Sequence, residues 1–434
     1  MNRSASFSNT AADERANYMG IVFCAFLSAV CVVTIAKGMP IIATFATIIF
    51  AIFASNKSAN EILMFLALAI PNTRSMEAFG ISGAILACAL FLVLHIICTH
   101  KINRKIFVIG VIYLIYSFQF IVRFDDAKIG FIMPLKIVMV LWSMMLIAKN
   151  LNNNHLSIEY VLRINNSMFI GIVSAVIASI ISTGSITRLS VIENDPNMLA
   201  VECAFVLSVY CITYFEGYIS TLFFIGTTTV LVCFGIMCGS RMGILLLIFV
   251  ILASILLNIR RVNRMFLLIL VSTIVTIVFL SSNTGQNILH VLENRNNVLS
   301  AQNNISNGRF DLWKEYFDTF NSNKSLWLFG LGSYTYYGID SMAHNFLIED
   351  LASYGIIGTS LIYYAYCVVF KTVAVGNRKY KNKKRLFTVL PFVIPLIGGM
   401  TLHGISSMPN FLMMFVGIMV IFSIRMNGGN RYEQ

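Results

Sequence analysis

The sequence predicts an all-α membrane protein with many transmembrane helices, and three observations lead to this fold class. Of the 434 residues, 58% are hydrophobic and only 12% are charged, whereas a soluble domain has about 45–50% apolar and about 25% charged residues. The mean hydropathy is +0.80. The apolar runs are continuous, which favours spanning helices over the alternating pattern of a transmembrane β-barrel.

A transmembrane helix needs about 20 apolar residues, with roughly 17–25 tolerated. Fourteen runs approach this length: 18–36, 39–55, 59–71, 78–99, 105–122, 129–148, 166–183, 197–215, 218–236, 241–258, 264–280, 344–370, 387–403 and 409–425. The run at 59–71 is short and ends at Pro71, which indicates a broken or re-entrant segment. We therefore expect about 12–14 transmembrane helices.

Lys and Arg are unevenly distributed over the segments that connect these runs. With the N-terminus inside, twenty of them fall in inside segments and ten in outside segments, and Lys136 falls within a helix. Because positive residues concentrate in cytoplasmic segments, both termini are expected inside. The net charge of +12 is then explained by membrane orientation, and no nucleic-acid partner is expected.

This topology divides the chain into five parts. They are a cytoplasmic tail at 1–17, eleven helices over 18–280, a large outside loop at 281–343, three helices over 344–425 and a cytoplasmic tail at 426–434. The first 17 residues are polar, so no cleavable signal peptide is expected.

The large outside loop contains a predicted amphipathic helix at 309–320, with the sequence RFDLWKEYFDTF. Phe310, Trp313, Phe317 and Phe320 recur at helical spacing, and charged residues occupy the rest of the helix. A helix of this kind lies at the boundary between membrane and water.

Four residues on the predicted outside suggest a site for an anion with a base beside it. Arg241 lies in the short turn CGSRMG, Arg309 opens the amphipathic helix, and His344 and Asn345 precede a long apolar run. Arginine binds phosphate with two parallel hydrogen bonds, and a helix start at 344 offers unpaired N–H groups to an anion. The helix start also favours a neutral His344, which can accept a proton. Taken singly, each residue is equally consistent with an interfacial charge or a helix cap.

Further candidates for substrate contacts lie on the same side. Glu193, Asp195 and Asn197 precede an apolar run and suit hydrogen bonds to sugar, although Asp195, before a proline, is equally a turn former. His403 ends the next-to-last run on the outside. Trp313 suits sugar stacking, although interfacial anchoring explains it as well.

Two charged residues fall at membrane depth, where charge is unfavourable and is therefore a functional hypothesis. They are Lys136 and Glu202. Lys136 is close to the outer end of its helix, so extension of its side chain to the interface is an alternative explanation.

The order and spacing of GSRMG, NGRFDLW, a Gly-rich turn and AHNFL…YGIIG resemble the shared C-terminal region of the bacterial O-antigen ligase and O-antigen polymerase superfamily. NDPNMLA at 194–200 resembles an upstream element of that group, and the match covers roughly residues 190–360. The resemblance implies that Arg241 and Arg309 are the two family arginines and that His344 is the family histidine.

The resemblance also implies a GT-C-like membrane glycosyltransferase in the bacterial cytoplasmic (inner) membrane, with its active site facing the periplasm or outside. Its donor and acceptor would be glycans linked to undecaprenyl pyrophosphate, without a nucleotide sugar, a metal or a cofactor. Membrane lipid would surround it, and a chain-length regulator and a flippase are candidate protein partners.

Three functions remain open at this point. A polymerase would join repeat units of O-antigen, capsule or another surface polysaccharide, and family analogy favours it. A ligase would transfer the finished glycan to a lipid A-core or another acceptor. A flippase would carry polar residues along its helices and show two similar halves. Convergence of Arg241, Arg309 and His344 would favour a transferase, whereas separation beyond about 15 Å would exclude the mechanism.

Overall fold

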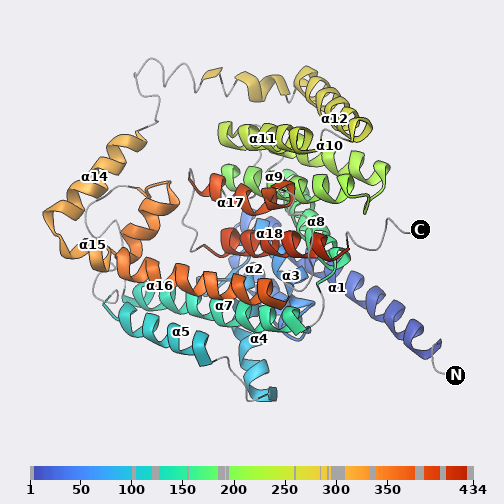
Figure 1. The fold of residues 1–434 in the computed structure, drawn as a ribbon. Coiled ribbons are helices and arrows are strands. Elements are labelled where there is room, and N and C mark those ends of the chain that lie inside the picture. The colour runs from blue at the N-terminus through green and yellow to red at the C-terminus, as the bar shows by residue number, and fades with distance from the viewer. Residues whose placement is uncertain are drawn as a thin grey trace.

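The structure is a computed structural model. It describes residues 4–99, 104–119, 127–153, 156–183, 191, 195–258, 261–283, 285–290, 293–294, 308–332, 339, 341–376, 386–400 and 407–427. Within these residues the chain forms a bundle of helices with one short β-hairpin (Figure 1).

The helices, in chain order, are α1 (Ser4–Ala36), α2 (Pro40–Ser55), α3 (Ile62–Ala69), α4 (Gly83–Thr99), α5 (Arg104–Ser117), α7 (Ala127–Asn153), α8 (Ile158–Thr183), α9 (Pro196–Phe215), α10 (Thr221–Met237), α11 (Arg241–Leu257), α12 (Val262–Ser281), α14 (Arg309–Ser322), α15 (Ser325–Phe329), α16 (Phe346–Gly376), α17 (Leu390–Gly399) and α18 (Met408–Asn427). Two short 3₁₀ helices, η1 (Ile70–Asn72) and η3 (Leu386–Val389), continue α3 and precede α17. The hairpin pairs β1 (Glu77–Ala78) with β2 (Ile81–Ser82).

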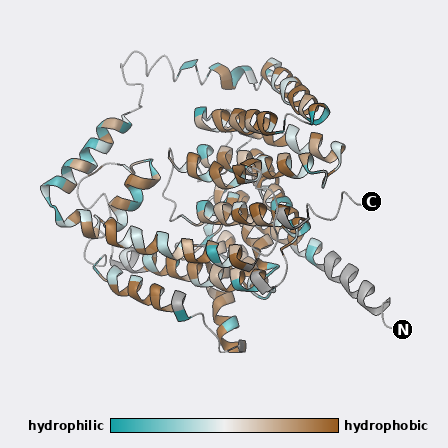
Figure 2. Cartoon of the chain, viewed as in Figure 1, coloured by the Kyte–Doolittle hydropathy of each residue, from teal (hydrophilic) through white to brown (hydrophobic). Residues whose placement is uncertain are grey.

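The predicted fold class is confirmed: the chain is an all-α, multi-pass membrane protein. Six helices of the described residues are long and apolar enough to cross a membrane: Asn17–Ala36, Ile132–Leu151, Ile158–Thr183, Pro196–Phe215, Val262–Ser281 and Phe346–Val375. Shorter apolar helices occupy the other predicted runs. Figure 2 shows hydrophobic residues along the bundle helices and hydrophilic ones along α14.

The hairpin corrects the predicted run 78–99, whose helix begins only at Gly83. Phe79 and Gly80, with φ of 56° and 76°, form the two-residue turn between β1 and β2. Positive φ at both turn positions is typical of a type I′ hairpin. The Lys136 ammonium donates to the Gly80 carbonyl at 2.6 Å, so this charged residue of α7 has a structural partner.

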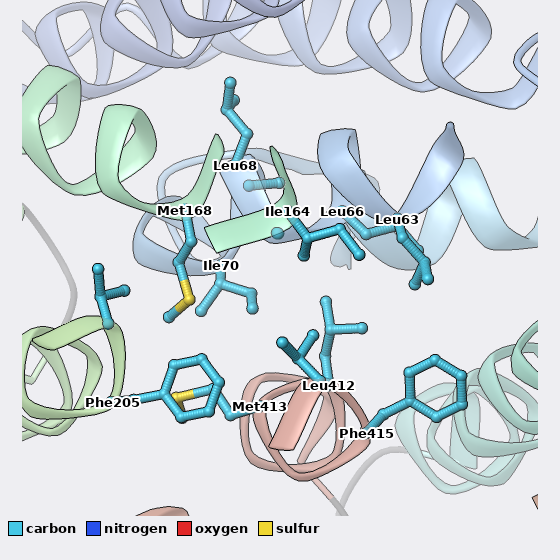
Figure 3. Packing of buried hydrophobic residues seen from close by; sticks show 14 of the residues in the cluster. Leu63, Leu66, Leu68, Ile70, Ile164, Met168, Phe205, Leu412, Met413 and Phe415 are labelled. Carbon is cyan, nitrogen blue, oxygen red and sulfur yellow. The ribbon is translucent and has the colours of Figure 1, made fainter. Parts of the chain in front are cut away.

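Helix α9 lies at the centre of the bundle, and the whole of its apolar stretch is buried. It packs against α8, α10, α11 and α17, which explains why it is hydrophobic on every side. Figure 3 shows the interior beside it, where Phe205 of α9 faces Met168 of α8 and Met413 of α18. At the other end of α9, Arg264 donates to the carbonyls of Tyr214 and Phe215 at 2.5 and 2.7 Å and so satisfies the end of the helix.

A second, smaller hydrophobic core lies at one end of the bundle, where α14, α15 and the first part of α16 meet (Figure 1). Its buried residues are Tyr316, Phe320, Leu326, Leu331, Ile339, Ala343 and Ala352. The predicted amphipathic helix is present as α14, but its buried face is rotated from the expected one. Phe310 is 67% exposed and Phe317 is 37% exposed, because Trp313, Tyr316 and Phe320 turn toward this core instead.

Helix α3, the short predicted run, packs against α8 at a position where only glycine fits. A Cβ atom on Gly171 of α8 would lie 2.3 Å from the Leu68 carbonyl oxygen. Small residues allow such close approach between membrane helices. By contrast, a Cβ atom on Gly226 of α10 would meet no atom of the described residues within 4 Å.

We expect Gly171→Ala to lower the melting temperature of the detergent-purified protein, because overpacking typically costs 1–3 kcal/mol. Gly226→Ala is the matched control. It should leave the melting temperature unchanged or raise it, since glycine in a helix is about 0.5–1 kcal/mol less stable than alanine. A Gly171→Ala protein that melts at or above the wild-type temperature would contradict this packing.

Candidate functional site

The first part of the site is the start of α11. Gly239, with φ of 56°, turns the chain, and the Ser240 hydroxyl caps the helix by accepting the Gly243 N–H at 3.1 Å. Arg241 is the first residue of the helix and is exposed. The short turn predicted from the sequence is therefore a helix cap that presents an arginine.

The start of α9 packs directly against the start of α11. Asp195 caps α9 by accepting the Asn197 N–H at 2.8 Å. A Cβ atom on Gly243 would lie 2.2 Å from the Cβ of Ala200, so the first turns of the two helices touch. Asp195 is therefore the turn former that its sequence context allowed, and its carboxylate lies on the same end of the bundle as Arg241.

Arg309 is the first residue of α14 and is half-buried. Gly308, with φ of 76°, supplies the left-handed turn before it. One helical turn later, the Trp313 indole N–H donates to the Ala343 carbonyl at 2.7 Å, and Tyr316 donates to the Ser341 carbonyl at 2.9 Å. These bonds fasten the segment that precedes His344 onto the helix that begins with Arg309.

His344 lies between that segment and α16. Its φ is 50°, a left-handed conformation that is uncommon for residues other than glycine and asparagine. Asn345 follows and caps α16, because its side-chain oxygen accepts the Leu347 N–H at 3.0 Å. The helix therefore begins at Phe346, two residues later than the sequence predicted. The strained backbone at His344 is of the kind that persists where the surrounding structure enforces it.

Charge interactions connect these helix starts. Partial burial lowers the pKa of the Arg309 guanidinium, the Asp195 carboxylate opposes this shift, and the positive charge of Arg241 adds to it. An arginine stays protonated despite such a shift, because its ordinary pKa is above about 12. Arg309 of α14 therefore lies near enough to Asp195 of α9 and Arg241 of α11 for their charges to interact.

The arrangement suits a doubly charged anion. The three charged residues stand at the starts of α9, α11 and α14, and the start of a helix carries a partial positive charge and unpaired N–H groups. Arginine adds a planar pair of donors that matches phosphate oxygens. Among the described residues, no group of three or more His, Cys, Asp or Glu side chains is placed to hold a metal ion.

The remaining predicted site residues differ in where they lie. Glu193 and His403 are outside the described residues. Asn197 contributes its backbone N–H to the cap of α9. Trp313 uses its indole N–H to hold Ala343, which gives it a structural role beside any contact with sugar. Glu202 is fully buried in α9, and both of its carboxylate oxygens are without a hydrogen-bond partner in the part of the chain that the structure describes.

Two further residues make contacts that hold α16, and of these Tyr116 was not found by sequence reasoning. Asp350 in the first part of α16 is buried and accepts a hydrogen bond from the Tyr363 hydroxyl at 2.8 Å. Tyr116 of α5 contacts the backbone of Tyr354 in the same helix. Spacing along the sequence gives no signal for the contact between Tyr116 and Tyr354, which are 238 positions apart.

The described residues thus form a multi-pass helical membrane protein in which the first residues of α11 and α14, Arg241 and Arg309, interact through their charges. The family model of O-antigen ligase matches residues 226–363, a stretch that contains Arg241, Arg309 and His344. This match confirms, over residues 226–363, the resemblance to the O-antigen polymerase and ligase superfamily, whose members are glycosyltransferase-like enzymes. No curated protein and no solved structure matches the chain.

The charge arrangement predicts opposite effects of two substitutions on binding of inorganic pyrophosphate. Arg309→Gln should weaken binding by about 10- to 100-fold, since a hydrogen bond to a charged group contributes about 1.5–3 kcal/mol. Asp195→Asn should tighten it by about 2- to 5-fold, because it removes a competing carboxylate while asparagine keeps the helix cap.

Isothermal titration calorimetry of the purified protein at fixed ionic strength measures both effects. The matched control is Asp318→Asn on the exposed face of α14, which should leave the affinity unchanged. Weaker binding by the Asp195→Asn protein would show that Asp195 does not compete with the anion.

Proposed function

We propose that this protein is a polymerase of oligosaccharide repeat units carried on undecaprenyl pyrophosphate, acting at the outer face of the bacterial cytoplasmic membrane. The growing glycan is transferred onto the non-reducing sugar of a new lipid-linked unit. One observation carries the proposal: Arg309 interacts with the charge of Arg241, and the helix that Arg309 begins holds the residue before His344. These contacts support an anion site and a potential base in the same region.

The diphosphate of the donor would bind between Arg241 and Arg309 at the helix starts. There the two guanidinium groups would offset the negative charge that develops on the leaving group, which is usually the largest catalytic term. Because diphosphate is a good leaving group, no separate acid is needed.

His344 would take the proton of the acceptor hydroxyl on a ring nitrogen. The hydroxyl oxygen would then form a bond to the anomeric carbon of the donor. The bond between that carbon and the diphosphate oxygen would break, and its electron pair would leave on undecaprenyl pyrophosphate. Direct displacement of this kind inverts the anomeric configuration.

A ligase is the second candidate, because the matching family model describes an O-antigen ligase. It would use the same donor site and the same base, and only the acceptor would differ. The positive-inside distribution of Lys and Arg supports an outward-facing site for both functions.

Incubation of the purified protein with lipid-linked repeat units alone separates the candidates. A ladder of longer glycans on a gel is the expected result and would support the polymerase. Transfer that appears only after addition of a separate lipid-core acceptor would support the ligase. No transfer, together with movement of lipid-linked units across proteoliposomes, would replace both with a flippase.

We expect His344→Asn to reduce the rate of this polymerisation by about 10²- to 10⁴-fold, the usual contribution of a general base. Asparagine tolerates the left-handed backbone at this position but does not accept a proton at neutral pH. The matched control is His290→Asn, at an exposed histidine whose ring nitrogen lies 3.1 Å from the Asn294 side chain. A His344→Asn protein with wild-type melting temperature and wild-type rate would exclude the base assignment.

A further inference from the structure

Helix α16 is broken at Gly355, which has φ of 62° and ψ of 179°. Such a break frees carbonyl groups in the preceding turn that would otherwise bond to the next turn. In an apolar environment, each unpaired backbone group is strongly unfavourable. The partners of these carbonyls therefore determine the direction of the first half of the helix, residues 346–354.

The Gly-rich turn after α15 supplies two of the partners. Leu331 donates its N–H to the Ala352 carbonyl at 2.6 Å, and Gly332 donates to the Ser353 carbonyl at 3.3 Å. A Cβ atom on Gly330 would lie 2.5 Å from the Gly355 nitrogen. Backbone touches backbone here, which gives the Gly330-Leu331-Gly332 turn of the sequence a physical role.

Tyr116 of α5 supplies the partner for the last carbonyl before the break. Its hydroxyl donates to the Tyr354 carbonyl at 2.6 Å and also lies 3.1 Å from the Phe329 carbonyl. Its ring packs against Gly358, where a Cβ atom would lie 2.7 Å from the ring. One side chain from the bundle thus contacts both halves of α16 and the end of α15.

This contact joins the two hydrophobic cores of the protein. Arg241 and Asp195 begin helices of the main core, and Arg309 belongs to α14 of the second core. His344 lies between the two cores, since Ala343 before it belongs to the second core and Phe346 after it belongs to the main core. The position of Arg309 and His344 relative to Arg241 therefore depends on how the second core is held against the bundle.

The first half of α16 is long enough that a small change of angle at Gly355 would displace His344 by a distance that affects catalysis. Nine residues of helix measure about 13 Å at 1.5 Å per residue, so a change of about 10° at Gly355 would move the end near His344 by about 2 Å. A displacement of 1 Å in a catalytic group can reduce a rate by about 100-fold.

We propose that Tyr116 is a positioning residue, which holds the break of α16 so that His344 and Arg309 are aligned with Arg241. The inference rests on the proposed function for its catalytic consequence. Its structural consequence, the fixed geometry at Gly355, stands apart from any activity and is measured separately.

The test compares Tyr116→Phe, which removes the hydroxyl and keeps the ring, with Tyr113→Phe one turn earlier on α5. Tyr113 also contacts the Tyr354 ring, but its hydroxyl has no hydrogen-bond partner among the described residues. Tyr116→Phe should lower kcat of polymerisation by about 10- to 100-fold and leave KM for the donor within about 2-fold. Tyr113→Phe should change neither.

A double mutant distinguishes positioning from a general loss of structure. In a His344→Asn background, Tyr116→Phe should cause little further loss, because there is no base left to align. Equal losses in both backgrounds, or a loss confined to KM, would overturn the proposal.

Hydrogen exchange of the backbone gives the readout that needs no activity. Tyr116→Phe should speed exchange at the Leu331 and Gly332 amides, which bond to the carbonyls at the break, and Tyr113→Phe should not. Faster exchange in a protein without transferase activity would exclude the proposed function but would support the role of Tyr116 in holding the backbone at Gly355. Unchanged exchange together with unchanged kcat would show that Tyr116 does not hold the backbone at Gly355, and would overturn the proposal.

Discussion

The hydrogen-bonding requirement of the backbone in an apolar environment is the constraint on which this structure depends. It explains why nearly every described segment is helical, and it becomes most demanding where α16 breaks at Gly355. There three separate segments, α5, the turn after α15 and the second half of α16, supply donors to the carbonyls that the break frees. Thr359 completes the set by donating to the Asp350 carbonyl at 2.9 Å. These hydrogen bonds set the direction of the first half of α16, and the Trp313–Ala343 bond holds the residue before His344 at its other end.

The candidate site carries a second constraint, which concerns the charges of side chains instead of the hydrogen bonds of the backbone. Partial burial and the positive charge of Arg241 both lower the pKa of the Arg309 guanidinium, so its charged form is less favourable there than in water. Asp195 relieves part of this charge, and its role as a helix cap fixes where it does so. A site of this type gives up some stability in the free protein and recovers it when a diphosphate replaces the carboxylate as the partner. Under the proposed function, the same interaction would later stabilise the leaving group.

The fold could be predicted from the sequence largely because membrane helices have a strong signal in composition and length. Each apolar run contains a helix, and the short run that ends at Pro71 is indeed the short α3, continued by η1. The hairpin at 77–82 was missed, since its turn at Phe79 and Gly80 lies in an apolar stretch that hydropathy does not separate from a helix. The rotated face of α14 was missed for a different reason. Periodicity alone predicts burial of Phe310 and Trp313 equally. The hydrogen bonds of Trp313 and Tyr316 to residues 341–343 turn Trp313 toward the core and leave Phe310 exposed.

For the candidate site, the sequence indicated the residue types and their common side, but it could not provide the geometry. Arg309 and Asp195 are more than a hundred residues apart in the sequence, and only the folded chain brings the start of α14 near enough to the start of α9 for their charges to interact. Tyr116 and Tyr354 illustrate the same limit, since no local pattern relates residues so far apart in the chain. The division of the site between two hydrophobic cores has a functional meaning under the proposed reaction. A diphosphate bound by Arg241 and Arg309 would contact residues of both cores at once. The charges that bind the donor would therefore also help to align His344 with the donor.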